Sequence, residues 1–286
     1  MKRTLRCKEY ELELGQRTLI MGILNVTPDS FSDGGEYITE ETAIQRAKQM
    51  VDEGADIIDI GGESTRPGSE KVSLEVEIGR VIPIVHALKD AVKVPISVDT
   101  YKAEVARQAL EAGAHIINDV WRLMADPDMA AVAASYDVPV ILMHNRTHMD
   151  YGYLLEDIIK DLQQSVRLAV RSGVPEEQIV LDPGIGFAKT YEQNLWLMSR
   201  LHSLVELGYP LLLGTSRKSM IRGTLGLPTA DLLEGTAATV ALGIAQGCDI
   251  VRVHDVKAMK RVAVMTDAIV RKFDGLEEPP SWTKSP

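Results

Sequence analysis

The sequence is poor in cysteine and has no hydrophobic run long enough to cross a membrane. Its two cysteines, Cys7 and Cys248, lie far apart and lack the spacing of metal ligands. This excludes a disulfide framework and indicates free thiols in a reducing compartment. No run approaches the roughly 18 apolar residues of a membrane span, and residues 1–14 contain no apolar stretch of signal-peptide length. We therefore expect a cytoplasmic protein.

Positive charge is also scarce, since 31 Lys and Arg residues stand against 41 Asp and Glu residues, a net charge of −10. This balance argues against nucleic acid or an anionic membrane as a partner and favours small-molecule substrates. Any site for an anionic substrate must be a local concentration of Arg, Lys and His. No GxGxxG motif follows the first apolar run, and the GTSRKS segment at 214–219 lacks the complete phosphate-loop pattern.

What the sequence does have is a regular alternation of short apolar runs and longer amphipathic segments. The expected strand and helix pairs are 19–24 and 41–54, 57–60 and 74–91, 95–98 and 103–113, 115–117 and 129–136, 138–143 and 154–172, 179–181 and 193–207, 211–213 and 235–246, and 250–253 and 256–271. Strands this apolar have no solvent face, which indicates a parallel sheet buried on both sides. Eight such units predict an α/β fold, a single-domain (β/α)8 TIM barrel.

We assign residues 1–275 to this barrel domain and residues 276–286 to a disordered C-terminal tail. The stretch 5–14 alternates polar and apolar residues around Gly15-Gln16, which predicts a short N-terminal β-hairpin. Pro83 predicts a kink or break in the second helix. An open doubly wound sheet is the alternative fold. It is disfavoured because polar residues end every strand instead of gathering at one switch point.

Active sites of such barrels form at the carboxyl ends of the strands, and here polar or charged residues follow every expected strand. In chain order they are Asn25, Glu63 to Arg66, Asp99, Asn118, His144, Asp182, Lys218, and Arg252 with His254. Helix N-capping could explain an Asp or Asn, and for Asp119 and Asp255 it is at least as good an interpretation. Capping does not explain Lys, Arg and His, so the set as a whole predicts a functional site.

Two further patterns suggest what this site binds. Arg252 and His254 are two residues apart on a strand, so both leave the same face and predict an anion site. The alternative is that Arg252 forms a surface ion pair with Asp255 or Asp249. The acids and amides Asp99, Asn118 and Asp182 suit a flat heterocycle rich in N–H donors, because a carboxylate accepts two parallel hydrogen bonds. The alternative there is a structural ion pair with Lys218.

At this point the motifs resemble one family. MGILNVTPDSFSDGG, DIGGESTRPGS, VDTYK, INDV, LDPGIGFAKT, GTSRKS and RVHD occur in this order between Leu19 and Asp255. Together they are similar to the dihydropteroate synthases, the folate-pathway family that includes the sulfonamide target. The resemblance implies that 4-aminobenzoate displaces diphosphate from (7,8-dihydropterin-6-yl)methyl diphosphate, giving 7,8-dihydropteroate with Mg²⁺ as cofactor.

The resemblance also implies roles for individual residues. Those for the pterin diphosphate are Thr65, Asp99, Asn118, Asp182, Lys218, Arg252 and His254. Those for 4-aminobenzoate are Arg66, Pro67, Phe187 and Ser219. Asn25 is the implied Mg²⁺ ligand, and Asp99, Lys218 and Asp33 are the implied catalytic residues, with Asp33 acting from a loop. The loops 27–35 and 63–69 are expected to close over the substrates.

Two other functions are compatible with parts of this pattern. A corrinoid-linked methyltetrahydrofolate methyltransferase shares the barrel and the pterin-reading acids, but it has no use for the two long loops or for Arg252 with His254. A paralogue that binds pterin without turnover is the non-enzymatic alternative. The family tends to form homodimers through the helices that follow the last three strands, where we expect exposed Trp196, Met198 and Leu204; ordinary packing against the barrel is the alternative for these side chains.

Overall fold

The computed structural model describes residues 3–27, 39–64 and 71–272. Its strands are β1 (Arg3–Cys7), β2 (Tyr10–Leu14), β3 (Leu19–Asn25), β4 (Ile57–Gly61), β5 (Ile96–Asp99), β6 (Ile116–Asp119), β7 (Val140–Met143), β8 (Ile179–Asp182), β9 (Leu212–Leu213) and β10 (Ile250–Val253). Its helices are α1 (Glu40–Asp52), α2 (Leu74–Lys89), α3 (Ala103–Ala112), α4 (Met129–Tyr136), α5 (Leu154–Arg171), α6 (Tyr191–Met198), α7 (His202–Val205), α8 (Ser219–Leu225), α9 (Leu233–Ala245) and α10 (Val256–Val270), with short 3₁₀ turns at Glu176–Gln178 and Thr229–Asp231.

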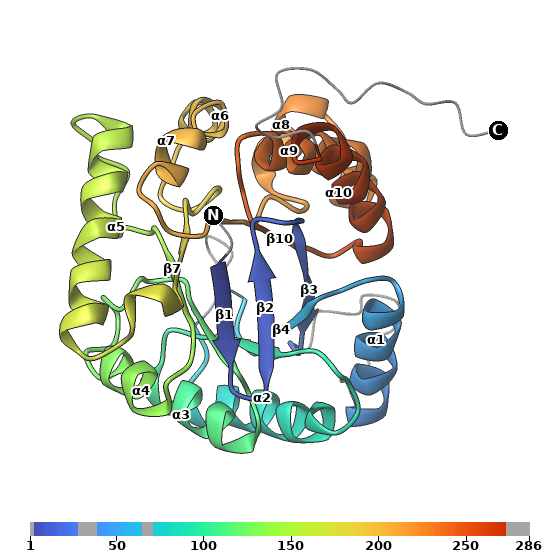
Figure 1. The fold of residues 1–286 in the computed structure, drawn as a ribbon, viewed down its shortest axis with the longest axis vertical. Coiled ribbons are helices and arrows are strands. Elements are labelled where there is room, and N and C mark those ends of the chain that lie inside the picture. Colours follow the sequence, from blue (N-terminus) through green and yellow to red (C-terminus); the bar gives the residue numbers. More distant parts are fainter. Residues whose placement is uncertain (1–2, 28–38, 65–70, 273–286) are drawn as a thin grey trace.

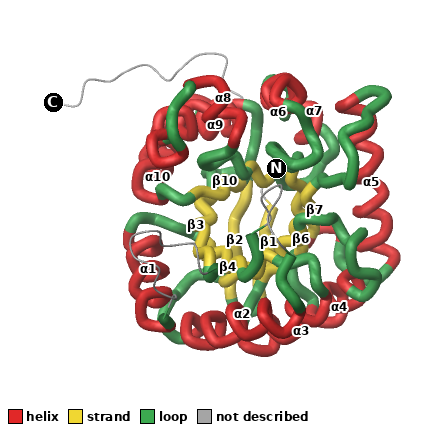
Figure 2. The backbone as a smooth tube through the Cα atoms, turned by 180° about the vertical axis from the view of Figure 1, so that it is seen from behind, coloured by secondary structure: helices red, strands yellow, loops and turns green. Residues whose placement is uncertain are grey.

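The predicted (β/α)8 barrel is confirmed. Eight parallel strands follow the order β8-β7-β6-β5-β4-β3-β10-β9. The two ends of this order meet, because a parallel bridge joins Leu181 to Leu211 and the Leu181 N–H donates to the Pro210 carbonyl at 2.9 Å. The helices form an outer ring around the strands (Figures 1 and 2). The carboxyl ends of all eight strands therefore face one opening, and the open doubly wound sheet is excluded.

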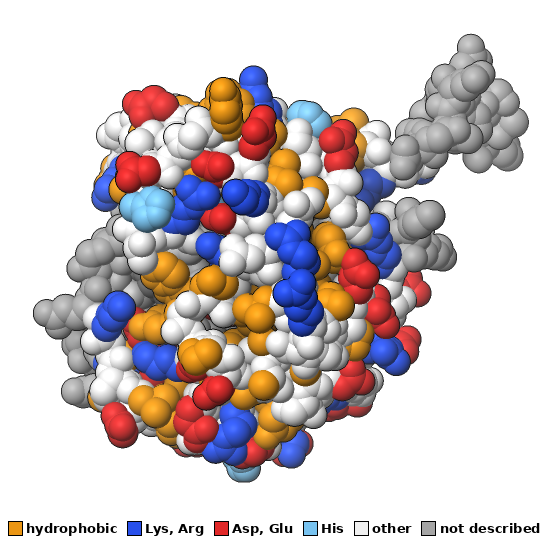
Figure 3. Space-filling model, turned by 90° about the vertical axis from the view of Figure 1, so that its left-hand side faces the viewer, with side chains coloured by type: hydrophobic (Ala, Val, Ile, Leu, Met, Phe, Trp, Pro, Cys, Tyr) orange, Lys and Arg blue, Asp and Glu red, His pale blue; other side chains and the backbone are white. Residues whose placement is uncertain are grey.

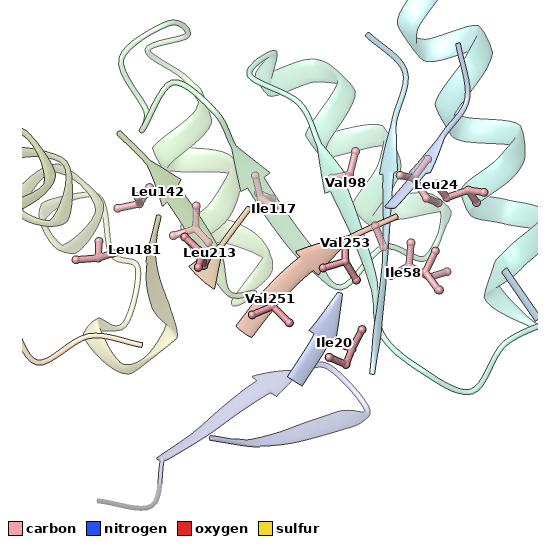
Figure 4. Packing of buried hydrophobic residues seen from close by; sticks show 14 of the residues in the cluster. Ile20, Leu24, Ile58, Val98, Ile117, Leu142, Leu181, Leu213, Val251 and Val253 are labelled. Atoms are coloured by element: carbon pink, nitrogen blue, oxygen red, sulfur yellow. The ribbon is translucent and has the colours of Figure 1, made fainter. Parts of the chain in front are cut away.

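The first hydrophobic cluster lies between the strands and the helices. It contains the strand side chains that point outward, including Ile20, Ile58, Ile117, Leu142 and Val251, all at most 1% exposed. Figure 4 shows these side chains around the sheet. Alternate residues of the same strands must then point into the barrel. The strands are thus buried on both faces, as their composition predicts.

The second cluster fills the amino-terminal half of the barrel interior. The inward residues Ile57, Ile116, Ile141 and Val180 pack there with Leu5 and other side chains of the β1–β2 hairpin. The predicted hairpin is confirmed and covers this end of the barrel (Figure 1). The hairpin was expected around Gly15-Gln16, but its turn lies elsewhere. Cys7 pairs with Tyr10, so the turn is at residues 8–9.

Two helix predictions need correction. The predicted kink or break at Pro83 is wrong as to a break, because helix α2 continues through Pro83 to Lys89. A proline inside a helix usually interrupts it. The expected helix 193–207 is instead two helices, α6 and α7. Short i to i+3 hydrogen bonds occur where α6 ends, from Ser199 N–H to Trp196 O, and where α7 begins, from Leu204 N–H to Leu201 O. The capping box of Thr190 and Gln193 starts α6 two residues earlier than predicted.

The predicted tail at 276–286 lies outside the described residues, so the proposed domain limits stay a prediction. No helix in the described part of the chain is long and apolar enough to span a membrane.

Candidate active site at the carboxyl end of the barrel

Strand pairing brings the predicted residues to one level of the barrel. Asn25 is in register with Gly61, Gly61 with Asp99, and Asp99 with Asn118. A Cβ on Gly61 would lie 3.6 Å from Asn25 Oδ1 and 3.7 Å from Asp99 Oδ2, so these two side chains flank the same glycine. Parallel pairing alone therefore gathers an amide, a carboxylate and a second amide from β3, β5 and β6, three of four neighbouring strands.

The inward face changes character along each strand. Ile57, Ile116, Val180 and Ile250 belong to the apolar lower cluster. Two residues further on, the same faces carry Asp59, Asn118, Asp182 and Arg252. Because side chains alternate with a period of two, the polar set forms the layer directly above the apolar one.

Arg252 is the centre of this polar layer. Its Nε donates to Asp59 Oδ2 and its Nη2 to Asp99 Oδ2, each at 2.6 Å. The Asn118 Nδ2 donates to the same Asp59 oxygen at 3.2 Å. The expected alternative, a surface pair with Asp255 or Asp249, is wrong: Asp255 pairs with Arg217 at 2.7 Å, and Asp249 accepts from the Leu211 N–H.

Asp59 is a site residue that the sequence analysis missed. Its side chain is 0% exposed, and its Oδ1 has no hydrogen-bond partner among the described residues; the same is true of Asp99 Oδ1 and Ser97 Oγ. Buried polar atoms without a partner are rare and call for a bound group or water. The signal was present, because an acid inside the apolar run DIIDIG, two residues before the strand end, must point inward.

Burial raises the pKa of the Asp99 carboxyl to about 7, although Arg252 opposes the shift; the neighbouring Asp59 carboxylate adds to it. Burial likewise raises the pKa of Asp182 to about 6, opposed by the hydrogen bond from the Gly184 N–H and by the charge of Lys218. Perturbed carboxyl pKa values in a polar layer at strand ends mark a functional-site candidate.

Asp182, Phe187 and Lys218 come together on the other side of the barrel. The Gly184 N–H donates to Asp182 Oδ1 at 2.7 Å. The Lys218 Nζ lies 4.1 Å from the centre of the Phe187 ring. A Cβ on Gly214 would lie 3.9 Å from both Asp182 Oδ2 and Arg252 Cβ, which links this group to the Arg252 layer.

His254 lies just past β10, where its Nδ1 is 2.9 Å from Ser216 Oγ and its carbonyl accepts from Arg46 at 3.1 Å. Ser219, the first residue of α8, is exposed. His144 is buried in a network with Asp161 and Lys189. Each of these predicted positions therefore lies at the carboxyl ends of the strands.

Four predicted residues, Asp33, Thr65, Arg66 and Pro67, lie outside the described residues, as do most of the loops 27–35 and 63–69. The stem of the second loop is described. The Lys102 Nζ donates to Glu63 Oε2 at 2.6 Å and to Glu77 Oε2 at 2.5 Å, and also to the Val72 carbonyl at 3.0 Å. Lys102 thus joins the chain on both sides of residues 65–70.

The capping interpretation holds for Asp119 only in part. Its carboxylate accepts from the N–H groups of Trp121 and Leu123, so it caps a turn, while the N-cap position of α4 is Asp128. Asp255 occupies the N-cap position of α10 but makes no side-chain cap bond there, because it pairs with Arg217.

Comparison with known proteins gives one consistent result. A family model described as "Pterin binding enzyme" matches residues 21–254. The dihydropteroate synthase of Clostridium beijerinckii is 58% identical over 263 residues, 92% of this chain and 98% of that protein. That of Bacillus subtilis is 56% identical over 268 residues, 94% of each chain.

Solved structures agree. The dihydropteroate synthase of Clostridium difficile, crystallised in the presence of pteroic acid, has a TM-score of 0.89 at 53% identity, covering 91% of this chain and 100% of its own. The Xanthomonas albilineans dihydropteroate synthase with 4-aminobenzoic acid has a TM-score of 0.89 at 39% identity, covering 94% of this chain and 98% of its own.

A barrel with a polar layer at its strand ends and a match over residues 21–254 places this chain in the family of pterin-binding enzymes. Within that family it belongs to the dihydropteroate synthases, transferases of folate biosynthesis. This sets aside the corrinoid-linked methyltransferase, since three relatives that are 52–58% identical to this chain are dihydropteroate synthases.

Proposed function

We propose that the polar layer binds (7,8-dihydropterin-6-yl)methyl diphosphate and that 4-aminobenzoate displaces its diphosphate there, giving 7,8-dihydropteroate. The observation that carries this proposal is the buried acid and amide set Asp99, Asn118 and Asp182, with Asp99 Oδ1 left without a partner among the described residues. The pteroic acid and 4-aminobenzoic acid named for the solved relatives support the same substrates.

The pterin ring would be held by Asp99, Asn118, Asp182 and Lys218. Asp182 Oδ1 is already occupied by the Gly184 N–H, which leaves its second oxygen for the substrate. Ionised carboxylates accept from N–H groups of a heterocycle, while the Asn118 amide matches a mixed edge of donors and acceptors. Lys218 would complete the set as a donor to a ring nitrogen or oxygen.

The diphosphate would be held by Arg252 and His254, with Thr65 from the second loop. Arg252 faces Asp59 and Asp99 in this structure. A role toward diphosphate therefore requires that its guanidinium exchange part of this contact for phosphate oxygens, which suit its planar donors equally well. The Asp59 carboxylate would then keep Arg252 at the barrel mouth.

The 4-aminobenzoate site would comprise Arg66, Pro67, Phe187 and Ser219. The Phe187 ring lies against the Lys218 ammonium, and Ser219 starts α8. This arrangement offers an aromatic surface for the ring and a positive charge for the carboxylate of the substrate.

The mechanism follows from the charges. An arylamine is neutral at pH 7, so no strong base is needed, and the difficult event is departure of diphosphate. Arg252 and His254 would stabilise its developing negative charge. Asp99 and Asp182, when ionised, would favour positive charge on the pterin methylene, which supports a dissociative path. Asp33 is proposed as a loop acid that assists once the substrates are bound.

Mg²⁺ is proposed as the cofactor, with Asn25 as its protein ligand. Asn25 offers a hard amide oxygen that, like Asp99 Oδ2, flanks Gly61 at the strand ends, and this donor chemistry fits the ion. Mg²⁺ commonly takes its other ligands from water and substrate phosphates. When bound, it would neutralise negative charge on the diphosphate.

A homodimer is proposed through α9 and α10. On α10, Val264, Met265 and Ile269 are 59%, 62% and 63% exposed, and on α9 Leu242 is 46% exposed. The face that carries α5 instead mixes hydrophobic with charged side chains (Figure 3). Of the residues predicted to be exposed, only Trp196 is exposed, at 40%. Met198 and Leu204 are buried in the main cluster, so for them the packing alternative is correct.

The proposed cytoplasmic location agrees with Cys7 and Cys248, which are free and buried. Sulfonamide binding, named for a Yersinia pestis relative, is proposed for this chain as well.

The proposed reaction is tested by incubating the protein with both substrates and Mg²⁺ and by measuring dihydropteroate and diphosphate. We expect stoichiometric formation of both products over many turnovers. Binding of the pterin diphosphate without release of diphosphate would instead identify a non-catalytic pterin-binding protein.

A further inference from the structure

The segment Gly184–Phe187 is a turn that contains one proposed substrate contact, Phe187, and touches two others, Asp182 and Lys218. Its Gly184 N–H donates to Asp182, and its Phe187 ring contacts Lys218. The turn closes on itself, because the Phe187 N–H donates to the Gly184 carbonyl at 3.1 Å. The position of this backbone therefore decides how Asp182, Lys218 and Phe187 face the substrates.

Lys189 lies directly beneath this turn and is only 6% exposed. Its Nζ donates to the carbonyls of Gly184 and Phe187 and lies against His144 Nδ1, each at 3.0 Å. An ammonium group has three hydrogens, so these three acceptors use all of them. Both ends of the 184–187 turn are thereby tied to one buried amino group, whose pKa burial lowers to about 7 although Asp182 opposes the shift.

His144 is held in the state that this contact requires. Its Nε2 lies 3.2 Å from Asp161 Oδ2, so the proton on Nε2 leaves Nδ1 free to accept. Burial lowers the pKa of His144 to about 4, although Asp161 opposes the shift, and the ring is therefore neutral at pH 7. Asp161 is itself held by Arg146 at 2.7 Å.

A second buried side chain also holds the turn. Asn194 on α6 is 3% exposed, and its Oδ1 accepts from the Gly186 N–H at 2.6 Å. Its Nδ2 donates to the carbonyls of Lys189 and Thr190 at 3.2 and 2.7 Å. Ala188, between Phe187 and Lys189, has a left-handed φ of 46°. A residue with a side chain adopts this conformation only where the surroundings impose it.

We propose that Lys189 and Asn194 are positioning residues: they fix the 184–187 turn so that Asp182, Phe187 and Lys218 face the substrates. Neither is assigned a contact with substrate. This rests on the proposed use of those three residues as binding groups. Loss of either clamp should let the turn shift by a fraction of an ångström to an ångström, which is enough to weaken binding of both substrates.

The test compares Lys189→Ala with Lys160→Ala, a control that removes an exposed lysine of α5. For Lys189→Ala we expect the KM for 4-aminobenzoate and the Kd for the pterin diphosphate to rise about tenfold or more, with kcat changed by less than about threefold. Mere loss of folded protein would lower the apparent kcat and leave KM unchanged. Lys160→Ala should match the unmodified protein.

Chemical rescue separates the ammonium from the rest of the side chain. The alanine variant lacks the equivalent of n-propylammonium, so adding this ion should restore KM in a saturable manner, whereas 1-propanol should not. Asn194→Ala keeps Lys189 and should raise the same constants by a smaller factor; it decides the question if Lys189→Ala does not fold.

Unchanged KM and Kd in the folded variants would overturn the positioning role. Asp182→Ala serves as the reference: if it too binds pterin diphosphate normally, the proposed site is wrong, and if it alone loses binding, only the positioning role is wrong.

Discussion

The two halves of the barrel interior differ sharply. The amino-terminal half is filled by aliphatic side chains and covered by the β1–β2 hairpin. The carboxyl-terminal half, two residues further along the same strands, holds Asp59, Asp99, Arg252 and two further carboxylate or amide groups, with three buried polar atoms unpartnered in the described part of the chain. The lower half obeys the rules for stability, and the upper half departs from them. Departures of this kind are expected where a substrate supplies the missing partners.

The largest expected effect is in the lower half. Ile141 is 1% exposed within the apolar cluster, and Ile141→Ala should reduce the free energy of unfolding by about 2–5 kcal/mol, through lost burial and a residual cavity. Urea denaturation measures this loss. The KM values of the folded variant should stay unchanged, and a large change in KM at full folding would mean that the two halves are not separate in function.

The carboxyl-terminal half, unlike the apolar half, should make substrate affinity depend on pH. The pKa values of Asp182 and Asp99 are raised to about 6 and about 7, and only the ionised forms accept two N–H groups. Pterin diphosphate affinity should therefore rise with pH up to about 7, by at most about tenfold per unit for each linked proton. Calorimetry between pH 5 and 8 measures this affinity. The Asp182→Asn variant should lose the part of the pH-dependent rise that is linked to the Asp182 proton.

The same two groups should act on stability with the opposite sign. Their folded pKa values lie above the ordinary value of 3.8, so the folded chain binds more protons between that value and about 7. Their contribution to the free energy of unfolding therefore falls as pH rises through this window. If the Asp99→Asn and Asp182→Asn variants kept the full slope of stability against pH, other groups would be responsible for it.

The smallest expected effect is at Ser97, whose buried hydroxyl has no partner among the described residues. Ser97→Ala removes an unsatisfied polar atom, so the free energy of unfolding should stay the same or rise by up to about 1 kcal/mol. Thermal unfolding would show this. A loss of 2 kcal/mol or more would indicate that the hydroxyl is satisfied, for example by an ordered water.

The alternation of strands and helices could be predicted because apolar runs and amphipathic segments are local features. The strand-end residues Asn25, Asp99, Asn118 and Asp182 could also be found, since parallel strands bring their carboxyl ends together. Asp59 was missed because its run was treated as uniformly apolar. Side chains two residues apart on a strand share a face, which is the rule that puts Arg252 and His254 together. The same rule puts Asp59 on the inward face of its strand.

The partners of Arg252 could not be predicted from local pattern. Asp59 is 193 residues away along the chain and becomes a neighbour only when the barrel closes. A nearby acid such as Asp255 was the natural candidate, but Arg217 pairs with it instead. The clamp of Lys189 and Asn194 was overlooked for a related reason, because its acceptors are backbone carbonyls and amides, which carry no signal in a sequence.

The most direct test of the substrate-reading upper layer is calorimetric titration of Asp182→Ala with the pterin diphosphate at pH 7.5. Removing a buried carboxylate that accepts from the ring should weaken binding about 100-fold, consistent with about 3 kcal/mol for charged hydrogen bonds. The free energy of unfolding should not decrease. Binding within about twofold of the unmodified protein would contradict the account, because the ring would then be read by other groups.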